Sequence, residues 1–266
     1  MENNENTSVK TQADLELLFS KHQLLDVLVE QFSEISDDEF TQAALAQIYL
    51  HKQADVPTMV GVLSPKWGEP QEVADMLIQL CEDDLMTYDV EAMRFIMEYE
   101  ISLDVQEMLE RYQYPLPSIT KPIPIGENKG SQTNTGYQTI KASPILNGSN
   151  VFNGMDLCLE HLDRANSVAL ELNLGVMTSE QGKPMPVVRK KDEDFTDFKK
   201  RKRQHDIFYS ATADVMDTLL ALSDEVYLTH KFDRRGRTYS CGYHVNTQGT
   251  DYNKAVLGLK NKELVT

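Results

Sequence analysis

The sequence predicts a mainly helical α+β protein, and three observations lead to this class. Apolar residues recur at helical spacing through much of the chain, which indicates amphipathic helices. A short alternating run at 85–102 predicts a β-hairpin. Prolines and glycines gather at 114–150, where regular elements are not expected. We therefore expect four segments: a helical N-terminal domain with a hairpin (1–113), a connecting segment (114–150), a helical segment (151–222) and a strand–turn–helix (223–266).

The N-terminal domain is expected to contain a helix over 14–32, a second running to about residue 52 with Ser36 and Asp37 as caps, a third after Pro70 and a fourth over 103–113. A short apolar segment, PTMVGVLSP, lies between two prolines. Helix, short helix, helix and hairpin are also the outline of a winged helix. The third helix, EVADMLIQLCEDD, is acidic and would repel DNA phosphates, which favours a purely structural role.

The second half is expected to be helical where its apolar spacing resumes. A long helix is predicted over 154–175, with Asn153 as N-cap and Gly175 at its end. Helical character resumes over 188–222 and includes the basic run KKRKR at 199–203. The glycine-rich stretch GENKGSQTNTG lacks the G-K-[ST] ending of a phosphate loop, so we interpret it as a flexible loop.

Charge is distributed unevenly between the two halves. The formal net charge is -16, of which residues 1–110 (24 acidic, 5 basic) contribute -19 and residues 111–266 (18 acidic, 21 basic) contribute +3. Any polyanion is therefore expected to bind the second half. Three scattered cysteines indicate a reducing compartment, and no secretory signal or membrane-spanning run is evident. These features predict a cytoplasmic protein.

No self-contained active site is evident. The six histidines lack H-x-x-x-H spacing, and neither a G-x-S-x-G elbow nor a G-x-G-x-x-G fingerprint occurs. We therefore predict no catalytic and no metal-binding residue in this chain, and expect any chemistry to involve another polypeptide.

One motif carries specific information. The stretch KFDRRGRTY (231–239) gathers cations around a glycine, and at fixed offsets it is followed by Asn246, Gln248, Gly249, Asp251 and Lys254. This pattern resembles the D-x-x-G-R region of the single-subunit RNA polymerases of bacteriophages and mitochondria. Upstream stretches resemble the same family in order: LPSITKPIPI (116–125), Gly136-Tyr137, NVFNGMDLCLEHL (150–162) and FKKRKRQHD (198–206). Two tryptophans usual in that family are missing.

The resemblance implies a role for each motif residue. Arg235 and Arg237 would contact template-strand phosphates or the RNA–DNA hybrid, and Asp233 would orient them. Gly236 would permit the turn, Tyr239 would stack on or hydrogen-bond to the template, and Lys254 would face the hybrid. The basic run would also meet nucleic acid, through Lys199, Lys200, Arg201, Lys202 and Arg203. Two readings stay open: a surface hairpin in which Asp233 merely pairs with Arg235, and a solvated basic face on the helix. Cys241 and His244 are expected to be structural.

The same resemblance implies a division of labour. In that family the metal-binding aspartates of the palm lie far beyond D-x-x-G-R, so a partner chain is expected to supply them together with Mg²⁺. The chain thus resembles the smaller subunit, comprising an N-terminal region, thumb helices and the palm edge, of the split heterodimeric polymerases of Enquatrovirus-type phages. Expected partners are a larger palm- and fingers-bearing subunit, template DNA with the RNA–DNA hybrid, and an accessory or single-stranded DNA-binding protein for promoter opening. No membrane is involved, and the host cytoplasm is the expected location.

The alternative is a non-catalytic, nucleic-acid-binding transcription regulator with a winged-helix-like region.

Overall fold

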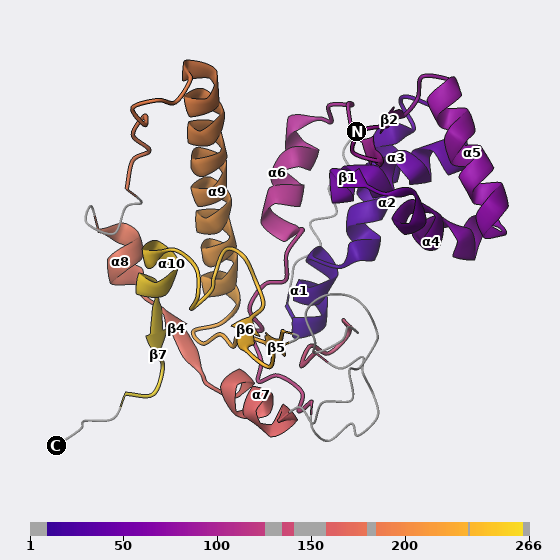
Figure 1. Ribbon diagram of the computed structural model, residues 1–266. Coiled ribbons are helices and arrows are strands. Elements are labelled where there is room, and N and C mark those ends of the chain that lie inside the picture. Colours follow the sequence, from indigo (N-terminus) through magenta and orange to yellow (C-terminus); the bar gives the residue numbers. More distant parts are fainter. Residues whose placement is uncertain (1–9, 126–134, 141–157, 180–184, 234, 263–266) are drawn as a thin grey trace, which may run out of the picture. The chain divides into compact units, whose positions relative to one another are not determined.

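A computed structural model describes residues 10–125, 135–140, 158–179, 185–233 and 235–262 (Figure 1). The described residues combine helices with small antiparallel sheets, as expected. The chain divides into two compact units, one of residues 21–109 and one of residues 1–20 with 110–266. The boundary between residues 109 and 110 lies close to residue 113, the expected end of the N-terminal domain. Helix α1 (Gln12–Leu18), expected with that domain, belongs to the other unit.

The unit of residues 21–109 contains most of the N-terminal helices. They are α2 (Lys21–Phe32), α3 (Glu39–His51), α4 (Val56–Trp67), α5 (Pro70–Glu82) and α6 (Leu103–Tyr112), the last of which crosses the boundary. Strands β1 (Gln53–Ala54), β2 (Thr87–Asp89) and β3 (Arg94–Ile96) form an antiparallel sheet in the order β1-β3-β2. The predicted hairpin and the helices after Pro70 and over 103–113 are confirmed.

One helix predicted for this part of the chain is wrong in its extent. The helix predicted over 14–32 is two helices, α1 and α2, which meet at Phe19 and Ser20, where the chain passes from one unit to the other. The apolar segment between prolines is helix α4. Pro57 falls in its first turn, where a missing N–H costs nothing, and the Asp55 side chain accepts the Thr58 N–H at 2.8 Å as a cap. Pro65 lies in its last turn.

The order α3-β1-α4-α5-β2-β3, with β1 paired to β3, matches the winged-helix outline. We call residues 39–96 the winged-helix-like region. Helix α5 buries one face through Val73, Leu77 and Leu80.

Helix α3 begins at an Asp38 cap rather than at Ser36 or Asp37, because the Asp38 carboxylate accepts both the N–H and the hydroxyl of Thr41.

The other unit packs its core around the C-terminal half of α9 (Phe195–Leu222), through Val215, Met216 and Leu219. Its remaining elements are α7 (Leu159–Asn166), β4 (Leu170–Leu172), α8 (Leu174–Thr178), β5 (His230–Phe232), β6 (Thr238–Ser240), α10 (Asp251–Ala255) and β7 (Leu257–Leu259). Strand β4 pairs with β7, and β5 pairs with β6, both antiparallel (Figure 1).

The single helix predicted over 154–175 is wrong. Residues 170–172 form β4, because Leu170 and Leu172 are buried, Leu170 also bridges Val226, and β7 supplies the strand partner. Gly175 lies inside α8, whose N-cap is Asn173, while Asn153 lies outside the described residues. The helix expected in the strand–turn–helix segment 223–266 is the short helix α10, which ends at Ala255 and is followed by β7.

One buried carboxylate secures α1 within its unit. Glu16 is fully buried, and its oxygens accept the backbone N–H groups of Gln138 and Thr139 at 2.7 and 2.5 Å. They also accept the Thr139 hydroxyl and the Gln12 side chain. A buried charge is tolerable only when it is hydrogen-bonded in this way, so Glu16 fixes the 138–140 segment against α1.

The Gly136-Tyr137 pair has a structural explanation. Gly136 has a φ of 91°, and a Cβ there would lie 3.1 Å from the Pro122 Cβ. Tyr137 is buried, donates its hydroxyl to the Leu116 carbonyl at 2.6 Å and packs edge-on against Phe19. The glycine permits the turn, and the tyrosine anchors the chain that follows.

Candidate nucleic-acid interface

The D-x-x-G-R motif forms the turn of the β5–β6 hairpin. Phe232 pairs with Thr238 in the last register position, which leaves the described residues 233 and 235–237 in the turn. The Asp233 N–H donates to the Arg237 carbonyl at 2.8 Å, and the Gly236 N–H donates to the Asp233 carbonyl at 3.0 Å. Gly236 has a φ of 78°, a left-handed conformation that glycine adopts without strain. The turn therefore depends on the glycine that the motif contains.

The Asp233 carboxylate organises this turn. One oxygen accepts the N–H groups of Arg235 and Arg237 at 2.8 and 2.9 Å, and the other accepts the Arg237 Nε–H at 2.7 Å. The Arg235 Nε lies 3.5 Å from the second oxygen. Burial would raise the pKa of the Asp233 carboxyl, but the hydrogen bonds from Arg237 outweigh it and hold that pKa below its ordinary value. The carboxylate thus stays charged and ties both arginines to one point.

The two arginines are nonetheless open to solvent. The exposed fraction of the side chain is 72% for Arg235 and 52% for Arg237, against 11% for Asp233. The Arg237 guanidinium carbon lies 5.4 Å from the centre of the Tyr239 ring, in cation–π range. A guanidinium held at its Nε can still offer its outer N–H groups to a phosphate. The turn therefore presents two oriented cations with an aromatic ring beside one of them.

Residues downstream of the turn brace the hairpin. The Gln248 side chain accepts the Ser240 N–H at 2.9 Å and donates to the Thr238 carbonyl at 3.0 Å, so it satisfies the free edge of β6 as a third strand would. Asn246 accepts the Ser240 hydroxyl and the Gln248 N–H. A Cβ at Gly249 would lie 3.0 Å from Asn253. The spacing of these motif residues therefore has a structural cause.

Lys254 lies on α10, which the same stretch positions. Thr250 caps this helix in a reciprocal pair with Asn253, and the Asn253 amide also donates to the His244 carbonyl. The Lys254 side chain is 52% exposed and approaches Asp251 at 3.4 Å, a weak surface pair. Lys254 is therefore available to an external partner.

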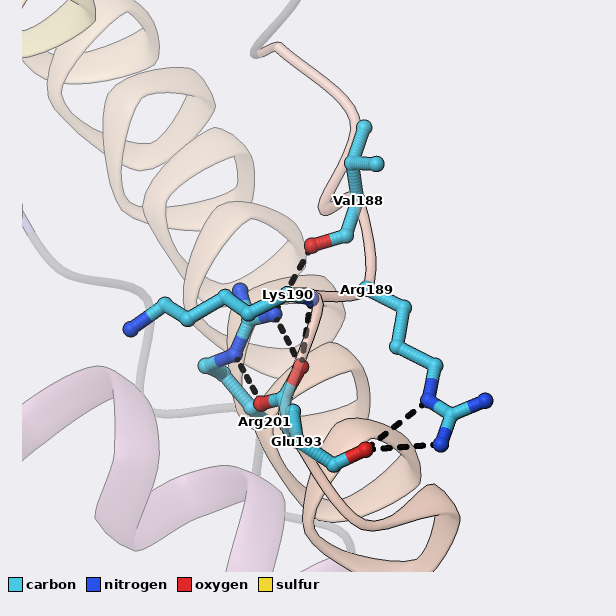
Figure 2. Close-up of polar contacts among 5 residues, drawn as sticks. All are labelled: Val188, Arg189, Lys190, Glu193 and Arg201. Carbon is cyan, nitrogen blue, oxygen red and sulfur yellow. Dashed lines mark hydrogen bonds and ion pairs between the residues drawn. The ribbon is translucent and has the colours of Figure 1, made fainter.

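In the α9 basic run, Arg201 has an internal role. Its Nε and Nη2 each donate to a Glu193 carboxylate oxygen at 2.7 Å, and Nη2 also donates to the Val188 carbonyl at 2.9 Å (Figure 2). Arg189 donates to the Glu193 carbonyl, and the Lys190 N–H donates to the Glu193 carboxylate. The Arg201 hydrogen bonds lower the pKa of the Glu193 carboxyl to about 2. Arg201 thus holds the 188–193 segment against α9. This structural role explains an arginine at this position of the basic run without any contact to nucleic acid.

The other four cations of the run, Lys199, Lys200, Lys202 and Arg203, are exposed. The Lys199 Nζ lies 4.6 Å from the centre of the Phe195 ring. Among the described residues, no hydrogen bond or ion pair joins these four side chains to the hairpin turn. The structure therefore gives two separate groups of exposed cations in one unit.

His244 braces the interior, as expected from sequence. It is 1% exposed, and its ring lies between the Glu110 carbonyl (2.7 Å from Nε2) and the Thr212 hydroxyl (2.9 Å from Nδ1). Burial lowers its pKa, and the neutral ring donates from Nε2 because the Glu110 carbonyl can only accept. Cys241 is mostly buried, and burial raises the pKa of its thiol, which makes it a poor nucleophile.

Within the part of the chain that the structure describes, no three His, Cys, Asp or Glu side chains gather as they would around a metal ion. None of the described helices combines the length and apolarity needed to cross a membrane.

Comparison of the sequence with protein-family models gives no match, and comparison with curated proteins gives none either. The functional assignment therefore depends on the residues and geometry described above.

Proposed function

We propose that this chain is a subunit of a bacteriophage DNA-directed RNA polymerase that holds the template strand and the RNA–DNA hybrid. A larger palm-bearing subunit performs nucleotidyl transfer. The observation that supports this proposal best is the Asp233-centred turn, because it exposes two oriented guanidinium groups where the resemblance expects template contacts. Arginine suits phosphate geometry because its fork can bind two oxygens at once. The host cytoplasm is part of the same proposal.

The proposal places Mg²⁺ on the partner. Two-metal nucleotidyl transfer requires carboxylates gathered around the ions, and in the family that the chain resembles these carboxylates belong to the palm. The proposal therefore assigns no step of the transfer to this chain. Its contribution is binding and positioning: Arg235, Arg237 and Lys254 contact the sugar–phosphate backbone, and Tyr239 contacts the template.

The exposed cations of α9 extend the proposed interface. Lys199, Lys200, Lys202 and Arg203 would add sequence-independent attraction for the backbone. Arg201 is left out of this set, since its Nε and Nη2 donors are bound to Glu193 and Val188.

A decisive test uses the chain together with the polypeptide encoded by the adjacent reading frame, which the proposal expects to carry the palm aspartates. The reconstituted pair should synthesise RNA in a Mg²⁺-dependent manner. Arg237→Ala should reduce elongation by about tenfold or more while the pair still assembles. The matched control is Arg164→Ala, which removes a highly exposed arginine that lies outside the motif. RNA synthesis by the isolated chain would contradict the division of labour.

The alternative is a transcription regulator that binds nucleic acid through the winged-helix-like region, and the topology of residues 39–96 favours it. Its central helix α5 carries Glu72, Asp75 and Glu82 and no Lys or Arg, which opposes contact with a phosphate backbone. Normal elongation by the assembled Arg237→Ala pair would favour this alternative.

A further inference from the structure

The winged-helix-like region contains a cavity of about 470 Å³ that the polymerase proposal does not use. Its walls come from the start of α4, from one side of α5 and from the β2–β3 hairpin. The apolar lining consists of Val56, Ala74, Ile78, Cys81, Tyr88 and Phe95. This volume falls in the range of sites that hold a ligand or an anchoring side chain.

The hairpin contributes an aromatic wall. Tyr88 and Phe95 are direct cross-strand partners, and their rings meet edge to face with centres 5.1 Å apart. Phe95 is 3% exposed, so this wall is fixed in the core of the unit. Ile78, in contrast, is 55% exposed although its side chain lines the cavity. An exposed large apolar side chain beside a rigid apolar wall is typical of an interaction site.

Helix α5 explains why this surface is left open. Its core face is the stripe Val73, Leu77 and Leu80, which is buried. Ala74, Ile78 and Cys81 follow one another at four and three residues, so they form a second apolar stripe on a neighbouring side of the helix. The second stripe lies outside the buried face of α5 and lines the cavity.

The charge around the cavity restricts what can bind there. Residues 21–109 contain 19 acidic and 4 basic residues, a net charge of -15. Glu82 is among the residues that line the cavity, and α5 carries no cation. The negative electrostatic potential of these carboxylates repels nucleic acid and attracts cationic groups. The cavity offers few polar groups to orient a small ligand, and a second copy of this acidic unit would be repelled.

We propose that the cavity binds a basic amphipathic helix of a partner protein. One or two apolar side chains of that helix enter between Ile78 and the Tyr88–Phe95 wall. Its flanking Lys or Arg residues meet Glu82 and Asp75, which lies three residues before Ile78 on α5. This is the helix-in-groove mode of recognition, with an apolar anchor and an electrostatic rim. The winged-helix-like region is thereby a protein-docking module, and this inference does not depend on the polymerase proposal.

The first test uses the whole chain and a fluorescein-labelled helical peptide of about 18 leucine and lysine residues, in amphipathic order. Fluorescence anisotropy at about 0.15 M salt measures binding. The leucine/lysine peptide should bind, whereas a leucine/glutamate peptide and a serine/lysine peptide of the same length should bind about tenfold more weakly or not at all. Equal binding of the serine/lysine peptide would overturn the apolar anchor.

The second test locates the site with charge-matched variants. Ile78→Glu should weaken leucine/lysine binding by about tenfold, whereas Val90→Glu, which alters a 77% exposed residue outside the cavity lining, should change it by less than about twofold. If circular dichroism shows that Ile78→Glu is unfolded, two single variants at exposed positions, Glu82→Lys and Asp104→Lys, replace it. Only Glu82→Lys should then lose affinity for the leucine/lysine peptide.

Three outcomes would overturn the proposal. Equal affinities of the matched variants would place binding elsewhere. A dimer in light scattering that Ile78→Glu dissociates would make a second copy the occupant. Binding of a DNA duplex that Ile78→Glu abolishes would return the region to nucleic-acid recognition.

Discussion

The Asp233 carboxylate accepts the Arg237 Nε–H at 2.7 Å while it also accepts the Arg237 backbone N–H at 2.9 Å. One acidic side chain thus fixes both the path of the turn and the direction of the cation that follows the glycine. This geometry combines the two readings of the motif: Asp233 does stabilise a surface hairpin, and in doing so it holds two arginines exposed to solvent.

Asp233→Asn should weaken binding of an RNA–DNA hybrid by several-fold, although neither arginine is altered. The asparagine can still accept the two backbone N–H groups, but its amide nitrogen then faces the Arg237 Nε–H, and two donors cannot bond. Arg237 loses its fixed direction as a result. Anisotropy with a labelled hybrid measures the effect, and Asp224→Asn, which removes a carboxylate paired with Lys260 outside the motif, is the control. Unchanged affinity in Asp233→Asn would contradict a positioning role.

Replacing Lys199, Lys200, Lys202 and Arg203 by alanine should reduce the salt dependence of hybrid binding. If each of the four cations neutralises one phosphate, the magnitude of the slope of log K against log salt falls by about 3.6. Arg201→Ala should leave that slope unchanged, since its donors serve Glu193 and Val188 (Figure 2). It should instead increase hydrogen exchange in the 188–193 segment. A loss of salt dependence in Arg201→Ala would contradict this separation of roles.

The ion pair between Glu193 and Arg201 should break at acidic pH. Hydrogen bonds from Arg201 lower the folded-state pKa of Glu193 from 4.5 to about 2, so the unfolded chain binds the proton first. The contribution of the pair to stability is therefore complete above about pH 4.5 and is lost as pH falls towards 2. The protection of residues 188–193 against hydrogen exchange, relative to the intrinsic exchange rate at each pH, should fall across this window in the natural chain. In Glu193→Gln this protection should be low at every pH in the window.

Elements with strong local signals were predictable from the sequence. Helix α5 follows Pro70 and has a regular buried stripe, and the β2–β3 hairpin alternates around DVEA. Elements that depend on contacts with residues far away in the sequence were not predictable from it. Residues 170–172 form a strand only because β7 and Val226, far along the chain, supply partners. Local apolar spacing is similar in a short strand and a helix, so the sequence alone favoured a helix there.

The candidate site shows the same limit. The resemblance named the residues of the turn, and the glycine predicted a tight backbone there. Nothing in the run KKRKR distinguished Arg201 from its neighbours, because its partner Glu193 lies eight residues earlier. That contact exists only once the 188–193 segment folds back along α9, outside any helical i,i+4 pattern. Four acidic residues precede the basic run, Asp192, Glu193, Asp194 and Asp197, and nothing in the sequence singles out Glu193 among them.

Glu16→Gln should destabilise the chain by about 2–3 kcal/mol. The carboxylate is fully buried and accepts hydrogen bonds from Gln12, Gln138 and Thr139, so an amide nitrogen in its place would face donors. Chemical denaturation measures the loss. Glu30→Gln, a change at the surface of α2, should have an effect below about 0.5 kcal/mol. A similar small effect for Glu16→Gln would mean that this network contributes little to stability.

His244 should make the fold sensitive to mild acid. Burial lowers its folded-state pKa below the ordinary 6.5, so the unfolded chain binds the proton more readily and stability falls as pH drops below about 6.5. His244→Gln keeps polar groups near Thr212 and the Glu110 carbonyl but cannot titrate. It should cost about 1–3 kcal/mol at pH 8, where imperfect hydrogen bonds replace good ones, and it should flatten the decline between pH 6.5 and 5. Thermal melts of both proteins across this range give the comparison. His22→Gln, which alters an exposed histidine paired with Asp26, should leave the decline in place. If His22→Gln flattened it and His244→Gln did not, the acid sensitivity would originate at the surface and not at this buried ring.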